Sequence, residues 1–415
     1  MAAKPILLAC YDFPPNKGIG GRRWAKFAKG LVAKGYQIHV IKAHPVSSSK
    51  NSGWTEDISE GIIVHSLPRS YPKVVSEGPK TLIDKLKYRW EINRLQRKEK
   101  GTIYDIASGW KDHFLEKASE VIQNNGITNV IATGAPFNLL YYTALLKDEF
   151  PDLNIIADYR DPWLTAQNYG MQDLAPLRLE YETAKQELVM ANANWITCPN
   201  EFLMSEIRSS AIVKPKSNFI ALPHFYDPDD LDVYLKKEKR KDDRIKIVYG
   251  GAVYLGMEKF LKRLNEGLDL LKEKSPEIAG RLDIEIYTPH QRFATFFEEN
   301  QDIVQFKDTV GKAFFKELNS ADAAFIFLAK HNSNFLTTKF FEYIPFRKPL
   351  FFLGAKGYVA TFIEDNVLGR VLEQPEDICK SLKDLAENKV VISKKFDVST
   401  LDLEHRTKQL MALFK

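Results

Sequence analysis

Cysteine and histidine are sparse in this sequence, and their spacing argues against two kinds of site. The 415 residues include three cysteines, Cys10, Cys198 and Cys379, which stand far apart and form no Cys-x-x-Cys pair. The eight histidines form no pair at helical spacing. The sequence therefore predicts free thiols, as in a reducing compartment, and no metal site.

Long apolar runs and a strong excess of one charge are also missing. No window approaches the ~18 to 20 apolar residues that a transmembrane helix needs. The first apolar run, Ile6–Cys10, is only strand-sized, so no secretory signal is expected. The net charge of +5, from 59 basic and 54 acidic residues, is too small to indicate a nucleic-acid partner. These absences predict a soluble, cytoplasmic protein.

What the sequence does contain is a repeated alternation of apolar runs and helical stretches. Strands are predicted over residues 6–10 and 37–41, with a helix over 22–34 between them. This βαβ pattern indicates a parallel sheet. It continues through the first half and restarts with a strand at 245–249. The sequence therefore predicts an α/β protein with two doubly wound domains.

The boundaries follow from changes in composition. A dense mixture of acidic and basic residues at 236–243 is typical of a solvated segment. The expected parts are an N-terminal domain over 1–225 with a basic insertion at 71–101, a linker at 226–244, a C-terminal domain over 245–395, and a terminal helix within 396–415.

The basic insertion has a helical pattern over Lys80–Lys100. Leu82, Leu86, Trp90 and Leu95 are predicted to lie roughly on one side. Such a stretch is most often a solvated helix whose apolar side faces the core. Contact with anionic lipid headgroups is the alternative.

A glycine-rich loop follows the first predicted strand. Gly18, Gly20 and Gly21 would allow the backbone to approach a ligand closely, and Arg22 could add a planar donor group. The loop is not a dinucleotide fingerprint, because Arg23 stands where the last glycine of GxGxxG would be. A plain strand-to-helix turn with surface arginines is the alternative.

A second candidate segment is Asp158–Trp163, directly after another predicted strand. Ligands bind at the carboxyl ends of strands in doubly wound sheets. Two carboxylates beside an arginine, here Asp158, Asp161 and Arg160, can hold a hydroxyl, orient a phosphate or move a proton. The alternative is an ion-paired strand end with Trp163 in the core.

The third segment begins at Thr337 and Thr338, which can cap a helix. Lys339 and Glu342 would share one face of that helix, three residues apart. A cation at a helix N-terminus is unfavourable unless an anion binds there. Glu342 is outside the capping-box position, which Phe341 occupies, so it could accept hydrogen bonds from ribose hydroxyls. A surface ion pair is the alternative.

Two weaker features lie nearby. Gly250 and Gly251 follow the first strand of the second half and could also allow close backbone approach. Asp227 and Asp229 have the spacing of a metal-binding pair, but they fall in the predicted linker, so no metal is expected there.

Together these segments resemble the family 4-like group of GT-B glycosyltransferases, which build bacterial surface polysaccharides. Residues 11–22 are similar to that group's first strand and glycine loop. Residues 158–163 resemble its DFRDPW signature, and residues 337–349 resemble its SKxFEYxxxGKP signature, the most specific of the three. The resemblance covers nearly the full length, including a final helix that crosses back to the first domain.

The resemblance implies two Rossmann-like domains that face a central cleft. It also implies metal-independent transfer with retention, no cofactor, a nucleoside-diphosphate sugar as donor, and a glycan or lipid-linked acceptor. Lipid contact through the basic helix at 80–100 would place the protein at the inner face of the membrane. The implied donor contacts are Gly20, Gly21, Arg22, Gly250, Gly251, Lys259, Asn334, Thr337, Thr338, Lys339 and Glu342. Arg160 and Asp161 would be catalytic, and Asp158 and Trp163 would contact the acceptor.

Two departures from the family pattern keep other functions open. Asn334 replaces the first glutamate of the family's E-x7-E pair. Ala252 and Met257 stand where a basic residue is common, and Lys259 is the nearest candidate. A nucleotide-sugar-binding protein without turnover is therefore one alternative. A nucleotide-sugar epimerase is another, although it would need catalytic carboxylates and a histidine around the donor.

Overall fold

The chain divides into two compact units. In the computed structural model, one unit contains residues 1–223 and 403–415, and the other contains residues 224–402. The structure describes residues 4–16, 18–45, 54–99, 105–166, 171, 174–235, 242–254, 256–329 and 333–415. Within these ranges no helix is long and apolar enough to cross a bilayer.

The first unit is built on a seven-stranded parallel sheet in the order β3-β2-β1-β4-β5-β6-β7. Its strands are β1 (Lys4–Ala9), β2 (Tyr36–Ala43), β3 (Ile62–Leu67), β4 (Asn129–Gly134), β5 (Asn154–Tyr159), β6 (Trp195–Cys198) and β7 (Asn218–Ala221). β1 pairs with β2 on one side and with β4 on the other. The strand order therefore reverses between β1 and β4, which is where such sheets bind ligands.

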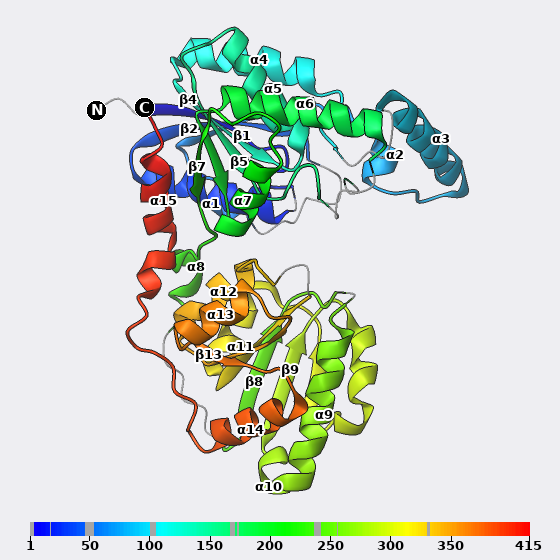
Figure 1. The fold of residues 1–415 in the computed structure, drawn as a ribbon, viewed down its shortest axis with the longest axis vertical. Helices are drawn as coiled ribbons and strands as arrows, with labels where there is room; N and C mark the ends of the chain where they lie inside the picture. The colour runs from blue at the N-terminus through cyan, green and yellow to red at the C-terminus, as the bar shows by residue number, and fades with distance from the viewer. Residues whose placement is uncertain are drawn as a thin grey trace. The chain divides into compact units, whose positions relative to one another are not determined.

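Helices cover both faces of this sheet. The helices of this unit are α1 (Ile19–Ala33), α2 (Lys73–Ser76), α3 (Leu82–Glu99), α4 (Lys111–Asn125), α5 (Phe137–Leu145), α6 (Pro176–Asn192), α7 (Glu201–Ser209) and α15 (Leu403–Met411). Figure 1 shows α4, α5 and α6 on one face and α1 and α7 on the other. The chain's last helix, α15, packs on α1 so closely that a Cβ at Gly30 would lie 2.4 Å from the hydroxyl of Thr407.

The second unit has a six-stranded parallel sheet in the order β10-β9-β8-β11-β12-β13. Its strands are β8 (Ile245–Gly250), β9 (Leu282–Tyr287), β10 (Val304–Lys307), β11 (Ala323–Leu328), β12 (Leu350–Gly354) and β13 (Gly369–Val371). β8 pairs with β9 and β11, so the strand order reverses between β8 and β11. The prediction of two doubly wound parallel sheets is confirmed.

Two apolar clusters cover the faces of the second sheet. The helices of this unit are α8 (Pro228–Leu231), α9 (Glu258–Lys274), α10 (Pro276–Ala279), α11 (Phe314–Ser320), α12 (Thr338–Tyr343), α13 (Tyr358–Asp365) and α14 (Pro375–Ala386). α9 and α14 contribute to one cluster and α11, α12 and α13 to the other. Ile247 and Val248, adjacent on β8, belong to different clusters because successive strand residues point to opposite faces.

Two segments differ from their predictions. Residues 226–235, predicted as the start of a linker, include α8, and Leu231, Tyr234 and Leu235 pack into the second unit's core. Residues 236–241 lie outside the described residues. The apolar spacing of 231, 234 and 235 is helical, and this outweighs the surrounding charge. In α3, Leu95 is buried whereas Leu82, Leu86 and Trp90 are exposed, so these four residues do not share one side.

A buried carboxylate ties three strands of the second sheet together. Glu285 on β9 accepts a bond from Lys246 at 2.8 Å and one from the hydroxyl of Tyr287 at 2.7 Å, and it also pairs with Lys307. Burial by itself would raise the pKa of Glu285. The hydrogen bonds from these three groups outweigh burial and lower the pKa to about 2.

Glu285→Gln is therefore expected to destabilise the protein in a pH-dependent way. The folded pKa of about 2 lies below the ordinary value of 4.5, so the stabilisation is complete above about pH 4.5 and is lost as the pH falls toward 2. Urea unfolding at pH 7 should show a loss of about 3 kcal/mol, shrinking at pH 3. Glu373→Gln, in an exposed pair with Lys356, is the control and should cost under about 1 kcal/mol. An equal loss at both pH values would contradict this role.

Candidate functional site

The second unit joins a strand end to a short helix at the point where its strand order reverses. Gly250 ends β8, and Gly251 follows it. The hydroxyl of Tyr343, on α12, accepts the N–H of Gly250 at 2.7 Å and donates to its carbonyl at 3.2 Å. This paired bond fixes α12 against the end of β8. We call Gly250, Gly251, Thr337, Thr338, Lys339 and Glu342 the Lys339 site.

Gly251 leaves the space that the side chain of Lys339 occupies. A Cβ at Gly251 would lie 1.8 Å from Cε of Lys339, and the φ of Gly251 is +147°. Gly250 is required for a different reason, since a Cβ there would lie 2.7 Å from the ring of Phe314. The glycine pair thus brings the Lys339 side chain directly over the strand end.

The positive charge of the Lys339 ammonium is only partly balanced by neighbouring groups. Burial lowers the pKa of Lys339, and the charge of Glu342 opposes that shift. Nζ lies 5.6 Å from the centre of the Tyr249 ring, a distance that suits a cation–π contact. In the described part of the chain, no carboxylate lies within ion-pair distance of Lys339. A partly desolvated cation of this kind favours an anionic ligand.

A second polar group at this site has no partner. Oγ1 of Thr337 is buried and makes no hydrogen bond within the described ranges. Thr337 occupies the N-cap position of α12, yet its side chain does not cap that helix. Buried hydroxyls are normally satisfied, so this one suits a ligand atom that accepts or donates a hydrogen bond.

The remaining predicted donor contacts of this unit lie in different settings. Thr338 begins α12 and Glu342 lies one turn further on, and both are half-buried. The side-chain oxygen of Asn334 accepts the N–H of Tyr358 at 3.0 Å, so Asn334 holds the start of α13. Lys259 is exposed near the start of α9, 4.9 Å from the Phe260 ring.

The first unit has a comparable arrangement around Arg160, which follows β5 and whose side chain reaches the end of β4. Arg160 donates from Nε to the carbonyl of Gly134 at 3.1 Å and from its terminal nitrogen to the carbonyl of Ala135. A Cβ at Gly20 would lie 1.7 Å from the guanidinium of Arg160, and one at Gly21 would lie 2.1 Å from the carbonyl oxygen of Asp12. The glycine loop and the arginine, predicted as separate features, therefore pack together.

Asp12 and Arg69 belong to the same place, although sequence reasoning did not select them. Arg69 donates to Asp12 at 3.3 Å. Burial raises the pKa of Asp12, and the positive charges of Arg69, Arg160 and Lys42 act against that shift. Asp12 lies just beyond the end of β1, and this position is a signal that the sequence carried. We call Asp12, Gly20, Gly21, Arg69, Arg160 and Asp161 the Arg160 site.

Asp158 lies outside the Arg160 site because its carboxylate is fully buried. It accepts bonds from the indole of Trp24 at 2.9 Å and from the hydroxyls of Thr133 at 3.0 Å and Thr197 at 2.9 Å. The guanidinium of Arg23 is 3.7 Å away. The geometry gives Asp158 a structural part, linking α1 to three strands, in place of the predicted contact with an acceptor.

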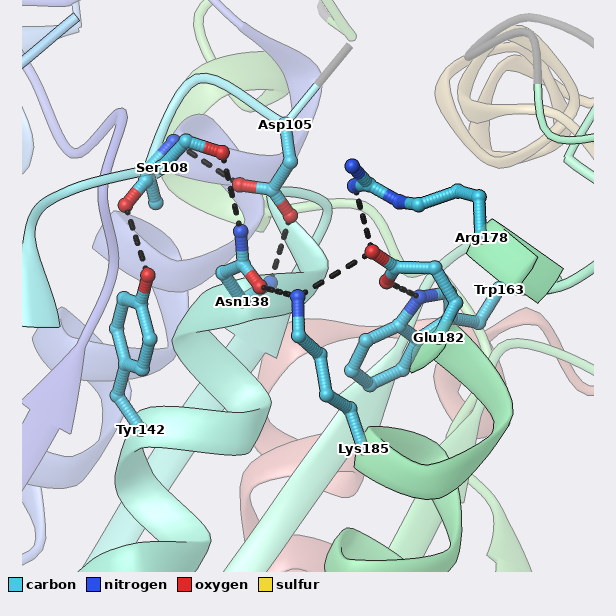
Figure 2. A network of polar contacts seen from close by, with 9 residues as sticks. Asp105, Ser108, Asn138, Tyr142, Trp163, Arg178, Glu182 and Lys185 are labelled. Atoms are coloured by element: carbon cyan, nitrogen blue, oxygen red, sulfur yellow. Dashed lines mark hydrogen bonds and ion pairs between the residues drawn. The ribbon is translucent and has the colours of Figure 1, made fainter. Parts of the chain in front are cut away.

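Trp163, the other predicted acceptor contact, is also fully buried. Its indole donates to Glu182 at 2.9 Å, within the network of buried charges in Figure 2. Glu182 is further paired with Arg178 at 2.6 Å and Lys185 at 3.2 Å. Lys185 in turn donates to Asn138 at 2.7 Å. The spacing of 178, 182 and 185 places these charges on one face of α6, a stripe that sequence reasoning missed.

Asp105 completes the network and fastens a loop beside the end of β1. It accepts the backbone N–H groups of Asn138 at 2.6 Å and Ala107 at 3.0 Å. Burial raises its pKa to about 6. The same loop accepts a bond from the hydroxyl of Tyr11 at its Ile106 carbonyl, at 2.8 Å. The loop is thereby tied to Tyr11, which precedes Asp12 of the Arg160 site.

Comparison with known proteins places this architecture. No family model matches the chain, and no curated protein matches it. Among solved structures, the chain resembles the protein in a structure described as trehalose-6-phosphate from E. coli bound with UDP-2-fluoro glucose. The TM-score is 0.63 and the identity is 10%, and the match covers 99% of this chain and 98% of that one. It also resembles a glycosyltransferase from Rickettsia africae, with a TM-score of 0.58, 10% identity, and coverage of 100% of this chain and 98% of that one. The fold is GT-B-like.

An epimerase shares this fold. The UDP-GlcNAc 2-epimerase from Methanocaldococcus jannaschii has a TM-score of 0.53 and 12% identity, with 99% of each chain covered. Because all three identities are low, the likeness concerns the fold alone. Any argument about function must therefore come from the residues of the site.

Two further predicted residues of the first unit, Arg22 and Asp161, are half-buried. Arg22 extends toward Trp54, with Cζ 5.8 Å from the ring centre. Asp161 directly follows Arg160 in the chain. Of the predicted site residues, the structure brings Gly250, Gly251 and Thr337 together with Lys339 in the second unit.

Proposed function

We propose that this protein transfers a sugar from a nucleoside-diphosphate sugar to a glycan or lipid-linked acceptor in surface-polysaccharide biosynthesis, with retention and without a metal. The observation that carries the proposal is the Lys339 site. A partly desolvated ammonium and a buried, unpartnered hydroxyl lie together where the strand order reverses in a GT-B-like fold. This arrangement suits a diphosphate.

In this proposal the second unit stabilises the departing nucleoside diphosphate. Lys339 would neutralise the negative charge that develops on the leaving oxygen, and Thr337 would donate a hydrogen bond from its hydroxyl. A preorganised donor in a water-poor site contributes more than it would in bulk water. Glu342, one turn along α12, would accept hydrogen bonds from the ribose hydroxyls.

The first unit would hold the acceptor. Arg160 is fixed by two backbone carbonyls and would orient an acceptor hydroxyl, while Asp161, half-buried and next to it in the chain, would accept the proton. Asp12 adds a carboxylate next to the same guanidinium. This assignment replaces the contacts first predicted for Asp158 and Trp163, which are buried.

A nucleotide-sugar-binding protein without turnover is the second candidate. It is favoured by Asn334, whose side chain caps α13 where the family pattern has a carboxylate. A nucleotide-sugar epimerase has weaker support, since it requires several carboxylates and a histidine around the donor, whereas Glu342 is the carboxylate of the Lys339 site.

A thermal-shift screen with UDP, GDP, ADP, CMP and dTDP, without added metal, tests the proposal. A ligand that binds the folded state must raise the melting temperature. We expect one nucleotide to do so, and its sugar conjugate to be consumed in the presence of an acceptor. Binding without donor hydrolysis or transfer would support the second candidate. No shift with any nucleotide at millimolar concentration would contradict both.

Glu342→Ala is expected to weaken binding of that nucleotide by at least ~1.5 kcal/mol, roughly tenfold, because a hydrogen bond to a charged group is lost. Titration calorimetry measures the change. Glu266→Ala, at an exposed position of α9, is the matched control and should leave affinity unchanged. Unchanged affinity in Glu342→Ala would remove Glu342 from the site.

A further inference from the structure

Helix α3 carries large apolar side chains that face solvent. Leu82 is 78% exposed, Ile83 77%, Leu86 69% and Trp90 61%. At 100° per residue, these four fall within an arc of about 100° over the first half of the helix. A concentration of exposed apolar groups marks a surface that binds something.

The opposite side of α3 is the side that docks on the protein. Leu95 is buried in a small cluster with Tyr71, Val75 and Ile106. Figure 1 shows α3 extending beyond the sheet of its own unit, with α2 beside it. The apolar arc of Leu82 to Trp90 therefore points away from the unit's own core.

The exposed end of α3 is held in helical form by its own cap. The hydroxyl of Thr81 accepts the N–H of Asp84 at 3.1 Å. The carboxylate of Asp84 accepts the N–H groups of Thr81 at 2.9 Å and Lys80 at 3.2 Å. This reciprocal capping fixes the first turn, so the apolar arc is formed before any partner arrives.

Basic residues border the apolar arc on both sides. By helical geometry, Lys85 and Arg89 lie on one flank, and Lys87 and Arg94 on the other. Residues 80–100 include eight basic and three acidic side chains, an excess of five. That excess equals the net charge of the whole chain, so all of the protein's surplus positive charge resides in this segment.

We propose that this face of α3 binds the surface of a bilayer that contains anionic phospholipid. The helix would lie in the plane of the membrane, with Leu82, Ile83, Leu86 and Trp90 between the acyl chains and the basic flanks at the headgroups. A convex apolar ridge with positive charge on both flanks matches a broad anionic surface better than a protein groove of one polarity. Binding of α3 to the bilayer would require no nucleotide, so this proposal is independent of the proposed sugar transfer.

Sedimentation with lipid vesicles tests the inference. The full chain should bind vesicles of phosphatidylcholine with about 30 mol% phosphatidylglycerol, and not phosphatidylcholine alone. Salt at about 0.5 M should weaken binding. Leu86→Asn with Trp90→Asn should lower the bound fraction at least tenfold. The matched control is Ile212→Asn with Val213→Asn, which alters two equally exposed apolar residues elsewhere and should bind normally.

Tryptophan emission gives an independent measurement. All six tryptophans lie in the described ranges, and among them only Trp90 is highly exposed. Anionic vesicles should therefore shift emission to the blue, and Trp90→Phe should abolish the shift. Failure to bind anionic vesicles would overturn the proposal. So would full binding by the Leu86→Asn, Trp90→Asn protein. If the wild-type protein did not bind vesicles but formed a dimer, and the double variant were a monomer, the partner of this face would be a second copy of the chain. The variant's nucleotide-induced thermal shift should be unchanged.

Discussion

Lys339→Met is expected to weaken nucleoside-diphosphate binding by about 2–3 kcal/mol, roughly 30- to 150-fold, because a charge-assisted contact with the diphosphate is lost. The stability of the ligand-free protein should move in the other direction. Burial lowers the pKa of Lys339, so its charged form is costly in the folded state. Methionine has a similar shape without that cost, and the melting temperature of the ligand-free protein should stay the same or rise.

Calorimetric titration and thermal unfolding measure these two effects on the same samples. Lys262→Met is the matched control, since Lys262 is exposed on α9 and contacts the ring of Phe296. It should change affinity by less than about twofold. Wild-type affinity in Lys339→Met would place the diphosphate elsewhere, whereas a loss of stability would mean that Lys339 acts as a structural residue.

Asp158→Ala is expected to destabilise the first unit by about 3–5 kcal/mol. The variant loses hydrogen bonds from Trp24 and from two threonines, and it leaves the buried guanidinium of Arg23 without its neighbouring charge. In urea unfolding, the midpoint of the first unit's transition should move to a lower urea concentration, and the midpoint of the second unit's transition should not change.

Asp161→Ala, in the same segment, is expected to lower the transfer rate with a smaller effect on stability than Asp158→Ala. Asp161 is half-buried, so its replacement should cost no more than about 1–2 kcal/mol, well below the loss expected for Asp158→Ala. The transfer rate should fall at least tenfold, because the proposed proton acceptor is removed. Equal stability of the Asp158→Ala protein and the wild type would contradict the structural part given to Asp158.

The long buried strands could be predicted from the sequence. β1, β5, β8 and β11 are apolar runs, because strands of a parallel sheet are covered on both faces. The four edge strands, β3, β7, β10 and β13, were missed. β7, β10 and β13 have only three or four residues, and the middle residues of β3 are at least partly exposed, so these strands carry little apolar signal of their own.

The residue types of the Lys339 site were also predictable, but their contacts were not. Gly251 and Lys339 were each predicted to meet a ligand, and the structure shows that the glycine makes room for the lysine. The two residues are 88 positions apart in the sequence, and parallel pairing of β8 with β11 brings their neighbourhoods together. No local pattern encodes that distance.

The sequence by itself determined two parallel α/β sheets, the polar segments at their strand ends and the position of the basic helix. Tertiary structure decided which members of each segment are accessible. Asp158 is buried and Asp161 is not, because a strand ends between them. Trp90 is exposed and Leu95 is buried, because α3 docks through its second half. Periodicity specifies which residues share a face, but only packing specifies which face meets the core.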